Sequence, residues 1–393
     1  MAVAVPVTLP AAAAGPARDP SVLAIDRRVP GRERLVHADP LTLRPRGATS
    51  VGLAGHGWPH AFNAERSLLV FGRWQPPSLR IVDARGLRVL RDVPLPGSGG
   101  LEMKAVAWLG RQIVVLIERK SSELALVRVE PDEGRVVAPT TIGRWSANVA
   151  ATKRRVVLLL APMGRIGTAR LLVVSAERVR TVRLTGIRAG SIPARQGKPY
   201  TAVVPGLAVA PREPVAWVVA AGRSAEVDLE TLAIRYRGEP RHPSSRQKVP
   251  VVGSARHAEW LSPGRLVVTG WDAARADGRG IVSKSHGVSV LDTAAWTERT
   301  IHPGVLLFYV RPPHLLTIGP GEPECGWSVL TAYTLAGVES YRVCEQRATG
   351  ELQFAGRYAR LGRVDGRVAV VDLSTGTIVA RVRDLGVNAL GGP

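Results

Sequence analysis

Near the end of the chain runs the stretch Arg367-Val-Ala-Val-Val-Asp-Leu-Ser-Thr-Gly-Thr-Ile-Val-Ala-Arg-Val-Arg383. Residues 368–373 and 377–382 are both rich in β-branched side chains, which favour strands. Ser374-Thr-Gly376 between them is a turn sequence. The stretch therefore predicts a β-hairpin with Asp372 beside its turn.

Variants of this hairpin recur along the chain. The positions that correspond to Asp372 are Asp39, Asp83, Glu130, Ser175, Asp228, Asp292 and Tyr333. Successive positions are 39 to 64 residues apart, and four of the seven intervals lie between 41 and 47. Further apolar runs of strand length lie between hairpins, for example at 105–109 and 113–117. Each repeat is therefore four strands over roughly 45 residues, the period and strand count of a β-propeller blade.

These repeats predict an all-β fold, a single β-propeller of four-stranded antiparallel blades. Counting hairpins gives eight blades, with seven as the alternative if a short first repeat merges with its neighbour. Only one clear strand, at 22–25, precedes the first hairpin, whereas the run at 385–390 follows the last. We therefore expect the N- and C-terminal strands to share a blade and close the ring. Residues 1–20 are predicted to be an unstructured leader or partial signal peptide, and residues 21–393 the propeller.

The Val370-Val-Asp-Leu-Ser-Thr-Gly376 hairpin, repeated at this period, resembles the propellers of the YVTN, quinoprotein-like and WD-repeat groups. The similarity is best to loosely defined bacterial β-propeller repeat proteins of unassigned function, which are often secreted, and it covers the chain from about Ser21. The resemblance implies the fold and little else, because this architecture hosts binding proteins, hydrolases, lyases and dehydrogenases. The tryptophan-docking motifs of quinoprotein blades are not evident, and Trp271-Asp272 precedes a loop instead of ending a blade strand as in WD repeats.

The first residues have part of the character of a signal peptide. Residues 1–17 carry no charge, and the Ala11–Ala14 run resembles a signal-peptidase site, although a basic segment before it is missing. We expect export to an extracytoplasmic or secreted location, and the alternative is a loose leader on a cytoplasmic protein. Elsewhere no apolar run reaches the ~18 residues that a membrane span needs.

Two cysteines, Cys325 and Cys344, lie in one repeat on either side of a predicted strand. Pairing around the turn at Ala336-Gly337 would place Cys344 opposite about Val329, a few residues from Cys325. A disulfide between Cys325 and Cys344 is therefore geometrically feasible, and two reduced thiols are an equal alternative.

The chain is strongly basic, with a formal net charge of +21. One interpretation is an anionic partner such as nucleic acid, an envelope polymer or lipid headgroups. The other is compositional, because only 6 of the 53 basic residues are lysine and the chain is also rich in Ala, Gly, Val and Pro, as a GC-rich genome produces. The basic residues form no run of five or more, so we favour the compositional interpretation.

Two glycine-flanked arginines are the first candidates for ligand binding. Arg165 lies in Pro162-Met-Gly-Arg-Ile-Gly-Thr168, and Arg188 lies in Thr185-Gly-Ile-Arg-Ala-Gly190. Glycines allow a ligand to approach the backbone, and two guanidinium groups can hold a carboxylate or phosphate through paired hydrogen bonds. The alternative is that the glycines form turns and the arginines coat them.

Two longer insertions carry the other candidates. Arg246 lies in the basic, proline-interrupted segment 237–256, which we expect to be a surface loop that contacts a partner. Trp271 and Asp272 open a second insertion, in which Trp271 can stack on a ligand and Asp272 can offer oxygens to calcium. The spacing misses the calcium-loop pattern and nearby arginines oppose a cation, so calcium is only a weak alternative and no other cofactor or metal is predicted.

No HExxH, GxSxG, Walker or CxxC motif occurs. We therefore predict a non-catalytic binding or interaction module, exported and monomeric, that presents a basic loop face to a protein or an anionic envelope component. The alternative is a propeller enzyme of lactonase, lyase or glycosidase type, with carboxylates or histidines from several blades at the mouth of the channel. A third hypothesis, binding of nucleic acid, is less favoured because it requires one continuous arginine face.

Overall fold

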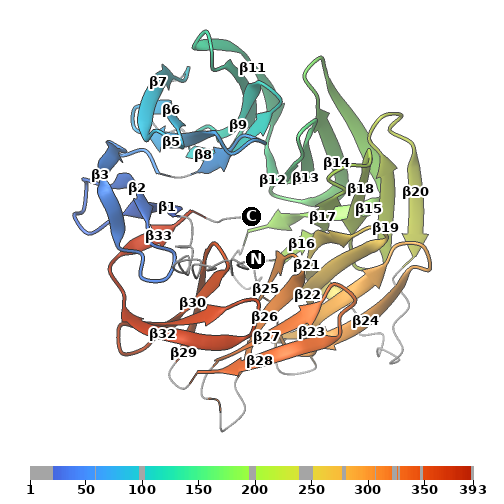
Figure 1. Cartoon of the computed structure of the whole chain (residues 1–393). Coiled ribbons are helices and arrows are strands. Elements are labelled where there is room, and N and C mark those ends of the chain that lie inside the picture. The colour runs from blue at the N-terminus through green and yellow to red at the C-terminus, as the bar shows by residue number, and fades with distance from the viewer. Residues whose placement is uncertain are drawn as a thin grey trace, which may run out of the picture.

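The chain folds into sheets that stand around a central axis like the blades of a propeller (Figure 1). The computed structural model describes residues 21–57, 59–96, 102–193, 201–238, 251–276, 280–305, 307–320, 325, 328–345 and 348–390. The regular structure of this part of the chain is 33 strands in seven sheets. No described segment forms a helix long and apolar enough to cross a membrane. The predicted leader, residues 1–20, lies outside the described residues.

Six of the sheets have four strands each. Their strands are β33 (Val387–Ala389), β1 (Val22–Asp26), β2 (Arg34–Ala38) and β3 (Pro45–Gly52); β4 (His60–Phe62), β5 (Leu68–Trp74), β6 (Pro77–Asp83) and β7 (Arg88–Pro94); β8 (Glu102–Leu109), β9 (Gln112–Glu118), β10 (Leu124–Glu130) and β11 (Arg135–Gly143); β17 (Gly206–Val209), β18 (Val215–Val219), β19 (Arg223–Asp228) and β20 (Ile234–Gly238); β25 (Leu307–Arg311), β26 (His314–Pro320), β27 (Ser328–Thr334) and β28 (Glu339–Cys344); and β29 (Ala348–Ala355), β30 (Tyr358–Arg363), β31 (Arg367–Asp372) and β32 (Thr377–Arg383).

The seventh sheet has nine strands. In order across the sheet they are β12 (Trp145–Ala151), β13 (Val156–Pro162), β14 (Ile166–Val174), β15 (Val179–Ile192), β16 (Thr201–Val204), β21 (Val251–Ser262), β22 (Arg265–Ala276), β23 (Gly280–Asp292) and β24 (Thr297–His302).

The prediction of eight separate blades, or seven as the alternative, is wrong, because only six four-stranded blades stand alone. The cause is the short strand β16, which pairs antiparallel with β15 and parallel with β21. Two apolar runs, residues 202–204 and 207–209, precede β18. Pro205 separates them, so that only the second becomes the inner strand β17 while the first joins two other repeats.

The first and last described strands share a sheet. Residues 24, 25 and 26 of β1 pair antiparallel with residues 389, 388 and 387 of β33. Gln353 on β29 also donates its side-chain amide to Asn388 Oδ1 at 3.0 Å. The strand β33 therefore contacts both β1 and the neighbouring β29–β32 sheet.

Apolar side chains fill the space between neighbouring sheets. The central strand β13 is buried along its whole length, because it is covered on both faces, and its sequence is accordingly a continuous apolar run. One buried cluster joins side chains of β13 to β15 to those of β17 to β19, including Leu171, Leu184 and Val218. Hydrophobic burial of this kind is the main favourable contribution to the folding of each repeat.

The quoted hairpin forms as predicted, with β31 and β32 on either side of the turn. Asp372 Oδ1 accepts the backbone N–H of Ser374 at 2.9 Å. The residue four positions after the aspartate adopts a left-handed conformation, with φ +71° at Gly376. Corresponding aspartates accept the N–H groups two and three residues later at Asp39, Asp83, Asp228 and Asp292. We call the turn between the third and fourth strands of each repeat the hairpin turn.

Several hairpin turns carry a bulky residue where a glycine is favoured. Leu43, Leu87 and Leu232 have φ values of 55°, 47° and 63°, and Trp296 has 55°. A left-handed conformation costs about 1–2 kcal/mol for a residue with a side chain. Leu43 and Leu87 are 1% and 5% exposed. Burial of these side chains offsets the backbone strain, since burying a leucine contributes about 1.5–3 kcal/mol.

Neighbouring repeats are joined by inter-blade hydrogen bonds, in which a side chain of one repeat donates to a backbone carbonyl of the next hairpin turn. Arg180 on β15 donates to Leu229 O and Glu230 O, both at 2.5 Å. The same arrangement recurs for His37 with Arg85 O, Arg91 with Glu133 O, Arg128 with Ala176 O, Arg299 with Ala336 O, Tyr341 with Leu373 O and Arg360 with Leu41 O. At the turn between β23 and β24 the direction is reversed, because Trp296 donates to Gly238 O at 2.8 Å.

The two cysteines form a disulfide, so the alternative of two free thiols does not hold in this structure. The Cα atoms of Cys325 and Cys344 are 4.8 Å apart. The register predicted for this hairpin is confirmed, because Val329 pairs with Cys344 across β27 and β28. The bond ties the segment before β27 to the end of β28.

Replacing Arg180 by alanine is expected to lower the stability of the ring. The change leaves two turn carbonyls without their donor, which costs roughly 1–3 kcal/mol. Arg183→Ala, on the same strand but exposed, is the matched control. Chemical denaturation measures both variants, and equal stability of the two would show that the inter-blade hydrogen bonds contribute little.

Candidate functional site

The antiparallel order of each four-stranded repeat places two kinds of turn at the same end of the ring. The turn between the first and second strands lies near the axis, and we call it the inner turn. The hairpin turn lies farther out at that same end. The inner turns comprise residues 63–67, 110–111, 152–155, 210–214, 263–264, 312–313 and 356–357.

Charges are separated between these two sets of turns. The basic residues of the inner turns are Arg66, Arg111, Lys153, Arg154, Arg155, Arg212 and Arg357, against two acidic residues, Glu65 and Glu213. The hairpin turns, with the residue before each, hold three basic residues, Arg44, Arg85 and Arg178, against ten acidic residues, which are Asp39, Asp83, Glu130, Asp132, Glu133, Glu177, Asp228, Glu230, Asp292 and Asp372. Two ion pairs join the two sets of turns, Arg155 with Glu230 and Arg357 with Asp372. A basic inner ring is therefore surrounded by an acidic outer ring at this end of the molecule.

A pocket of about 600 Å³ lies among the inner turns that precede β5, β9 and β13. Its floor includes the apolar side chains of Phe62, Val106 and Trp108, and its rim includes Glu65, Arg111 and Lys153. Lys153 Nζ and Glu65 Oε1 are 3.3 Å apart, and both side chains are more than half exposed. An ion pair exposed in this way is weak, so a ligand can replace it at little cost.

Two arginines lie over aromatic rings near the axis. The guanidinium carbon of Arg66 lies 4.1 Å from the ring centroid of Phe62, and that of Arg311 lies 4.3 Å from Phe354. Burial lowers the pKa of Arg311, and the positive charge of Arg66 lowers it further. The sheets of Arg66 and Arg311 are separated around the ring by those of β1 and β30 (Figure 1). The positive charge of Arg66 therefore acts on Arg311 although two sheets separate them around the ring.

Glu259 on β21 lies near Arg311. Part of the Glu259 side chain is exposed to solvent, but protein atoms surround the rest of it. This partial burial raises the pKa of Glu259, and the positive charge of Arg311 opposes the rise. Glu259 is the one carboxyl group whose pKa is raised among the described residues. On the same strand, burial lowers the pKa of His257, whose ring centroid lies 5.1 Å from that of Phe308.

The predicted binding residues lie elsewhere, on the nine-stranded sheet. Arg188 pairs with Thr168 across β15 and β14, and Arg165 directly precedes β14, so the two segments are neighbours. Both arginines are exposed, which leaves their joint binding of a carboxylate or phosphate a prediction. Trp271 and Asp272 lie on β22, three strands from β15 and therefore roughly 14 Å away. Arg246 lies outside the described residues.

Asp272 holds a buried polar cluster together. Its Oδ1 accepts Arg256 Nη1 at 2.8 Å, and its Oδ2 accepts His286 Nε2 at 2.6 Å. Burial alone would raise the pKa of Asp272, but these two hydrogen bonds outweigh it and lower the pKa to about 2. A calcium role for Asp272 stays a prediction that requires displacing both partners. Within the described residues no group of three His, Cys, Asp or Glu side chains is placed to hold a metal ion.

Sequence reasoning missed the residues that meet near the axis. Arg66, Glu259 and Arg311 are separated by up to 245 positions and belong to no common motif. The sequence does contain one indication of the inner-turn charges, because a basic residue recurs just after the first strand of most repeats. That signal needs the strand boundaries, which the sequence gives only approximately.

Comparison with known proteins gives the fold. No family model matches the sequence, and no curated protein matches it. A structure described as the dihydro-heme d1 dehydrogenase NirN in complex with DHE is similar with a TM-score of 0.55, 15% identity and coverage of 96% of this chain and 75% of that one. AztD from Citrobacter koseri is similar with a TM-score of 0.52, 10% identity and coverage of 95% and 98%. BamB from Moraxella catarrhalis gives a TM-score of 0.46, 13% identity and coverage of 87% and 94%. The chain is a β-propeller repeat protein.

Asp272→Asn is expected to destabilise the fold by roughly 3 kcal/mol at neutral pH, because it leaves the buried Arg256 without its counter-charge. The lowered pKa of Asp272 means that its carboxylate stabilises the fold above pH 3.8 and that this contribution is lost as the pH falls toward about 2. The variant should therefore lose less stability than the wild type over that interval. Asp132→Asn, at an exposed hairpin turn, is the control. If the stabilities of wild type and Asp272→Asn fall in parallel as the pH is lowered, the claim that the folded protein lowers the pKa of Asp272 is wrong.

Proposed function

We propose that the protein is a non-catalytic binding module whose inner-turn end holds an acidic segment of a partner protein or an anionic envelope component. The observation that carries the proposal is the basic inner ring within an acidic outer ring. A positive centre attracts an anionic segment, and the acidic surround directs it to the axis.

The pocket beside Phe62 and Trp108 supports the same proposal. Recognition surfaces combine apolar anchors at the centre with charged groups at the rim. Here the aromatic floor can take an apolar side chain of the partner, while Arg111 and Lys153 hold carboxylates beside it. A hydrogen bond holds the Trp108 ring in place, because its Nε1 donates to Ala61 O at 3.0 Å.

The acidic outer ring argues against nucleic acid as the partner. A duplex laid across this end of the ring would bring its phosphates against the carboxylates of the hairpin turns. A short peptide that enters along the axis avoids this repulsion. The geometry therefore favours a narrow anionic segment over an extended polyanion.

Catalysis is the alternative, and Glu259 is the residue that would carry it. A carboxyl group with a raised pKa can act as a general acid. Hydrolases of the glycosidase type need a second carboxylate about 5–10 Å away. The positive charge of Arg311 opposes the rise in the pKa of Glu259 that a general acid needs, which favours binding.

Export is part of the proposal. The disulfide between Cys325 and Cys344 supports an oxidising compartment, because such bonds are rare in the cytosol. A monomeric ring with its own disulfide then presents the inner-turn end to a partner outside the cytoplasm.

A fluorescein-labelled deca-glutamate peptide tests the proposed face by anisotropy. The triple variant Arg111→Glu, Arg154→Glu, Arg212→Glu should weaken binding on the order of tenfold or more, and added salt should weaken the wild type strongly. The matched control is Arg32→Glu, Lys120→Glu, Arg144→Glu, which changes the same charge at the opposite end. Equal losses in both triple variants would mean that net charge alone attracts the peptide and would contradict the proposal.

We also propose that the pairing of β33 with β1 closes the ring. Deleting residues 385–393 would expose the edge of β1 and should lower the thermal unfolding temperature and promote aggregation. The control lacks only residues 391–393. If both shortened chains unfold at the wild-type temperature, closure does not depend on this strand.

A further inference from the structure

A pocket of about 410 Å³ lies beside the turn that joins β1 to β2, at the end of the ring opposite the inner turns. Asp26 ends β1 and Arg34 begins β2, and the two residues pair across the strands. The turn between them therefore returns the chain to its starting point. The pocket is lined by Asp26, Arg28, Val29, Arg32 and Arg34. One short turn thus brings three exposed arginines to one cavity.

A buried carboxylate gathers two of these arginines. Asp26 is 3% exposed. Arg28 donates to it through Nε at 2.8 Å and through Nη2 at 2.7 Å, and Arg34 Nη2 donates at 3.2 Å to the Oδ2 atom that Arg28 Nη2 also contacts. The hydrogen bonds from Arg28 lower the pKa of Asp26 to about 2 against the opposing effect of burial, so the carboxylate stays charged. Two nitrogens that share one acceptor atom are close enough to share a second acceptor on their solvent side.

The three arginines retain unused hydrogen-bond donors. A guanidinium group has five N–H groups. Arg28 uses two of them on Asp26, and Arg34 uses one. The side chain of Arg32 forms no ion pair or hydrogen bond within the part of the chain that the structure describes. Donors of three side chains are therefore available to an anion in this pocket.

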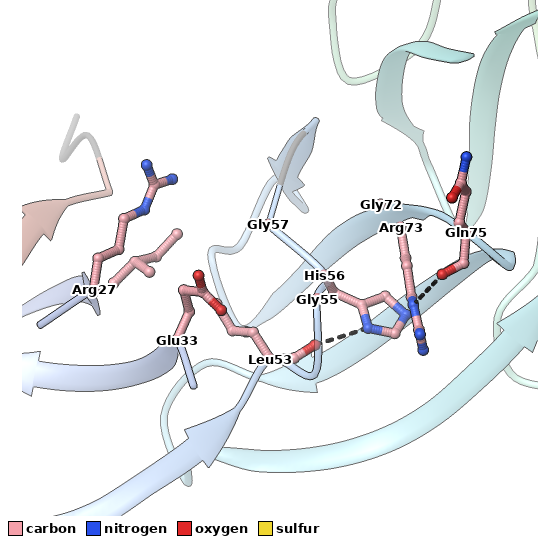
Figure 2. Close-up of a pocket in the computed structure, with 10 residues that line it drawn as sticks. Arg27, Glu33, Leu53, Gly55, His56, Gly57, Gly72, Arg73 and Gln75 are labelled. Carbon is pink, nitrogen blue, oxygen red and sulfur yellow. Dashed lines mark hydrogen bonds between the residues drawn. The ribbon is translucent and has the colours of Figure 1, made fainter. Parts of the chain in front are cut away.

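The lining of the pocket carries two excess positive charges, because three arginines stand against Asp26 alone. Glu33 belongs to the same turn, but its Oε1 accepts the backbone N–H of Gly31 at 3.2 Å. Figure 2 shows Glu33 with Arg27 among the residues that line a neighbouring pocket of about 610 Å³. The carboxylate of Glu33 is therefore not part of the lining of the arginine pocket.

The chain segment 383–386 is the other neighbour, and a backbone hydrogen bond of 3.0 Å joins it to the turn. Its acidic residue, Asp384, lines a separate pocket in which Asp365 and Asp384 stand against Arg367 and Arg383. The acidic groups of that pocket are matched by arginines of their own. The excess charge beside Asp26 is thus not balanced by the residues on either side of it.

We propose that this pocket binds a phosphomonoester group, carried by a small molecule or by a lipid headgroup. Its two excess positive charges match the roughly two negative charges of a phosphomonoester at neutral pH. Donors on three side chains suit a tetrahedral oxyanion better than a planar carboxylate with a single charge. Val29 is 52% exposed beside the arginines and offers an apolar surface to the rest of the ligand. The site does not depend on the function proposed for the inner-turn end.

Isothermal titration with inorganic phosphate at constant ionic strength tests the pocket on the full chain. The wild type should bind phosphate more tightly than acetate. The double variant Arg32→Gln, Arg34→Gln should weaken phosphate binding on the order of tenfold or more. In this variant Arg28 keeps its two hydrogen bonds with Asp26, so the turn retains its main internal contact.

The matched control is the double variant Arg85→Gln, Arg88→Gln. These two exposed arginines also lie close to one carboxylate, because their charges lower the pKa of Asp83. The control removes the same charge as the test variant, and it should bind phosphate as the wild type does.

Cosedimentation with phosphatidylcholine vesicles that contain phosphatidic acid distinguishes the two sources of phosphate. Binding of the wild type that is lost in Arg32→Gln, Arg34→Gln assigns the site to a lipid headgroup. Phosphate binding that is lost in the same variant, without sedimentation of the wild type, assigns it to a soluble phosphate ester. Either result supports the proposal.

Three results would each overturn the proposal: no binding of phosphate or vesicles by the wild type, acetate binding as tight as phosphate binding, or equal affinities in the two double variants. Circular dichroism verifies folding, and Arg32→Gln alone serves as the test if the double variant does not fold. Deca-glutamate binding by Arg32→Gln, Arg34→Gln should match that of the wild type. A failure at this pocket is thereby separated from a failure at the inner-turn end.

Discussion

The ring depends on the way each hairpin turn is held by the repeat before it. A hairpin on its own is only marginally stable, and the sheets contact one another mainly through apolar faces that do not define their relative rotation. Arg180 donates hydrogen bonds to two turn carbonyls, and similar bonds recur around the ring. Because hydrogen bonds are directional, these bonds fix how each sheet is rotated relative to the next. Each such hydrogen bond contributes about 1 kcal/mol, and the set links one repeat to the next.

The same interaction accounts for part of the unusual composition. Arginine suits this role because its planar, permanently charged group offers several donors to carbonyl oxygens. Many of the 53 basic residues are therefore structural, which agrees with the interpretation that the charge of +21 does not by itself indicate an anionic partner. The basic residues of the inner turns differ from these structural arginines in their position. Arg111, Arg154 and Arg212 are exposed around the axis, where structural use of their charge is not apparent.

Much of the fold could be predicted because its signals are local. The β-branched runs on either side of Ser374 gave β31 and β32, and the pairing of Cys344 with Val329 followed from turn position alone. The number of separate blades could not be predicted in this way. Strand β16 is too short and too similar to β17 in pattern for the sequence to show that it pairs with β21, about fifty residues later.

The site was less predictable than the fold. Arg165 and Arg188 were chosen for the glycines around them, and two of those glycines, Gly167 and Gly190, take part in the strand pairing between β14 and β15. The influence of the Arg66 charge on Arg311 results from ring geometry, and no spacing along the chain encodes it. Side chains that meet across an axis become visible only when the sheets are placed.

The central claim is that the inner-turn end of the ring is the face that binds. Hydrogen–deuterium exchange with and without the deca-glutamate peptide measures this most directly, because it reports each turn separately. The account predicts slower exchange at residues 152–155, 210–214 and 356–357 when the peptide is present. Slower exchange confined to residues 27–33 and 53–57, at the opposite end, would contradict it.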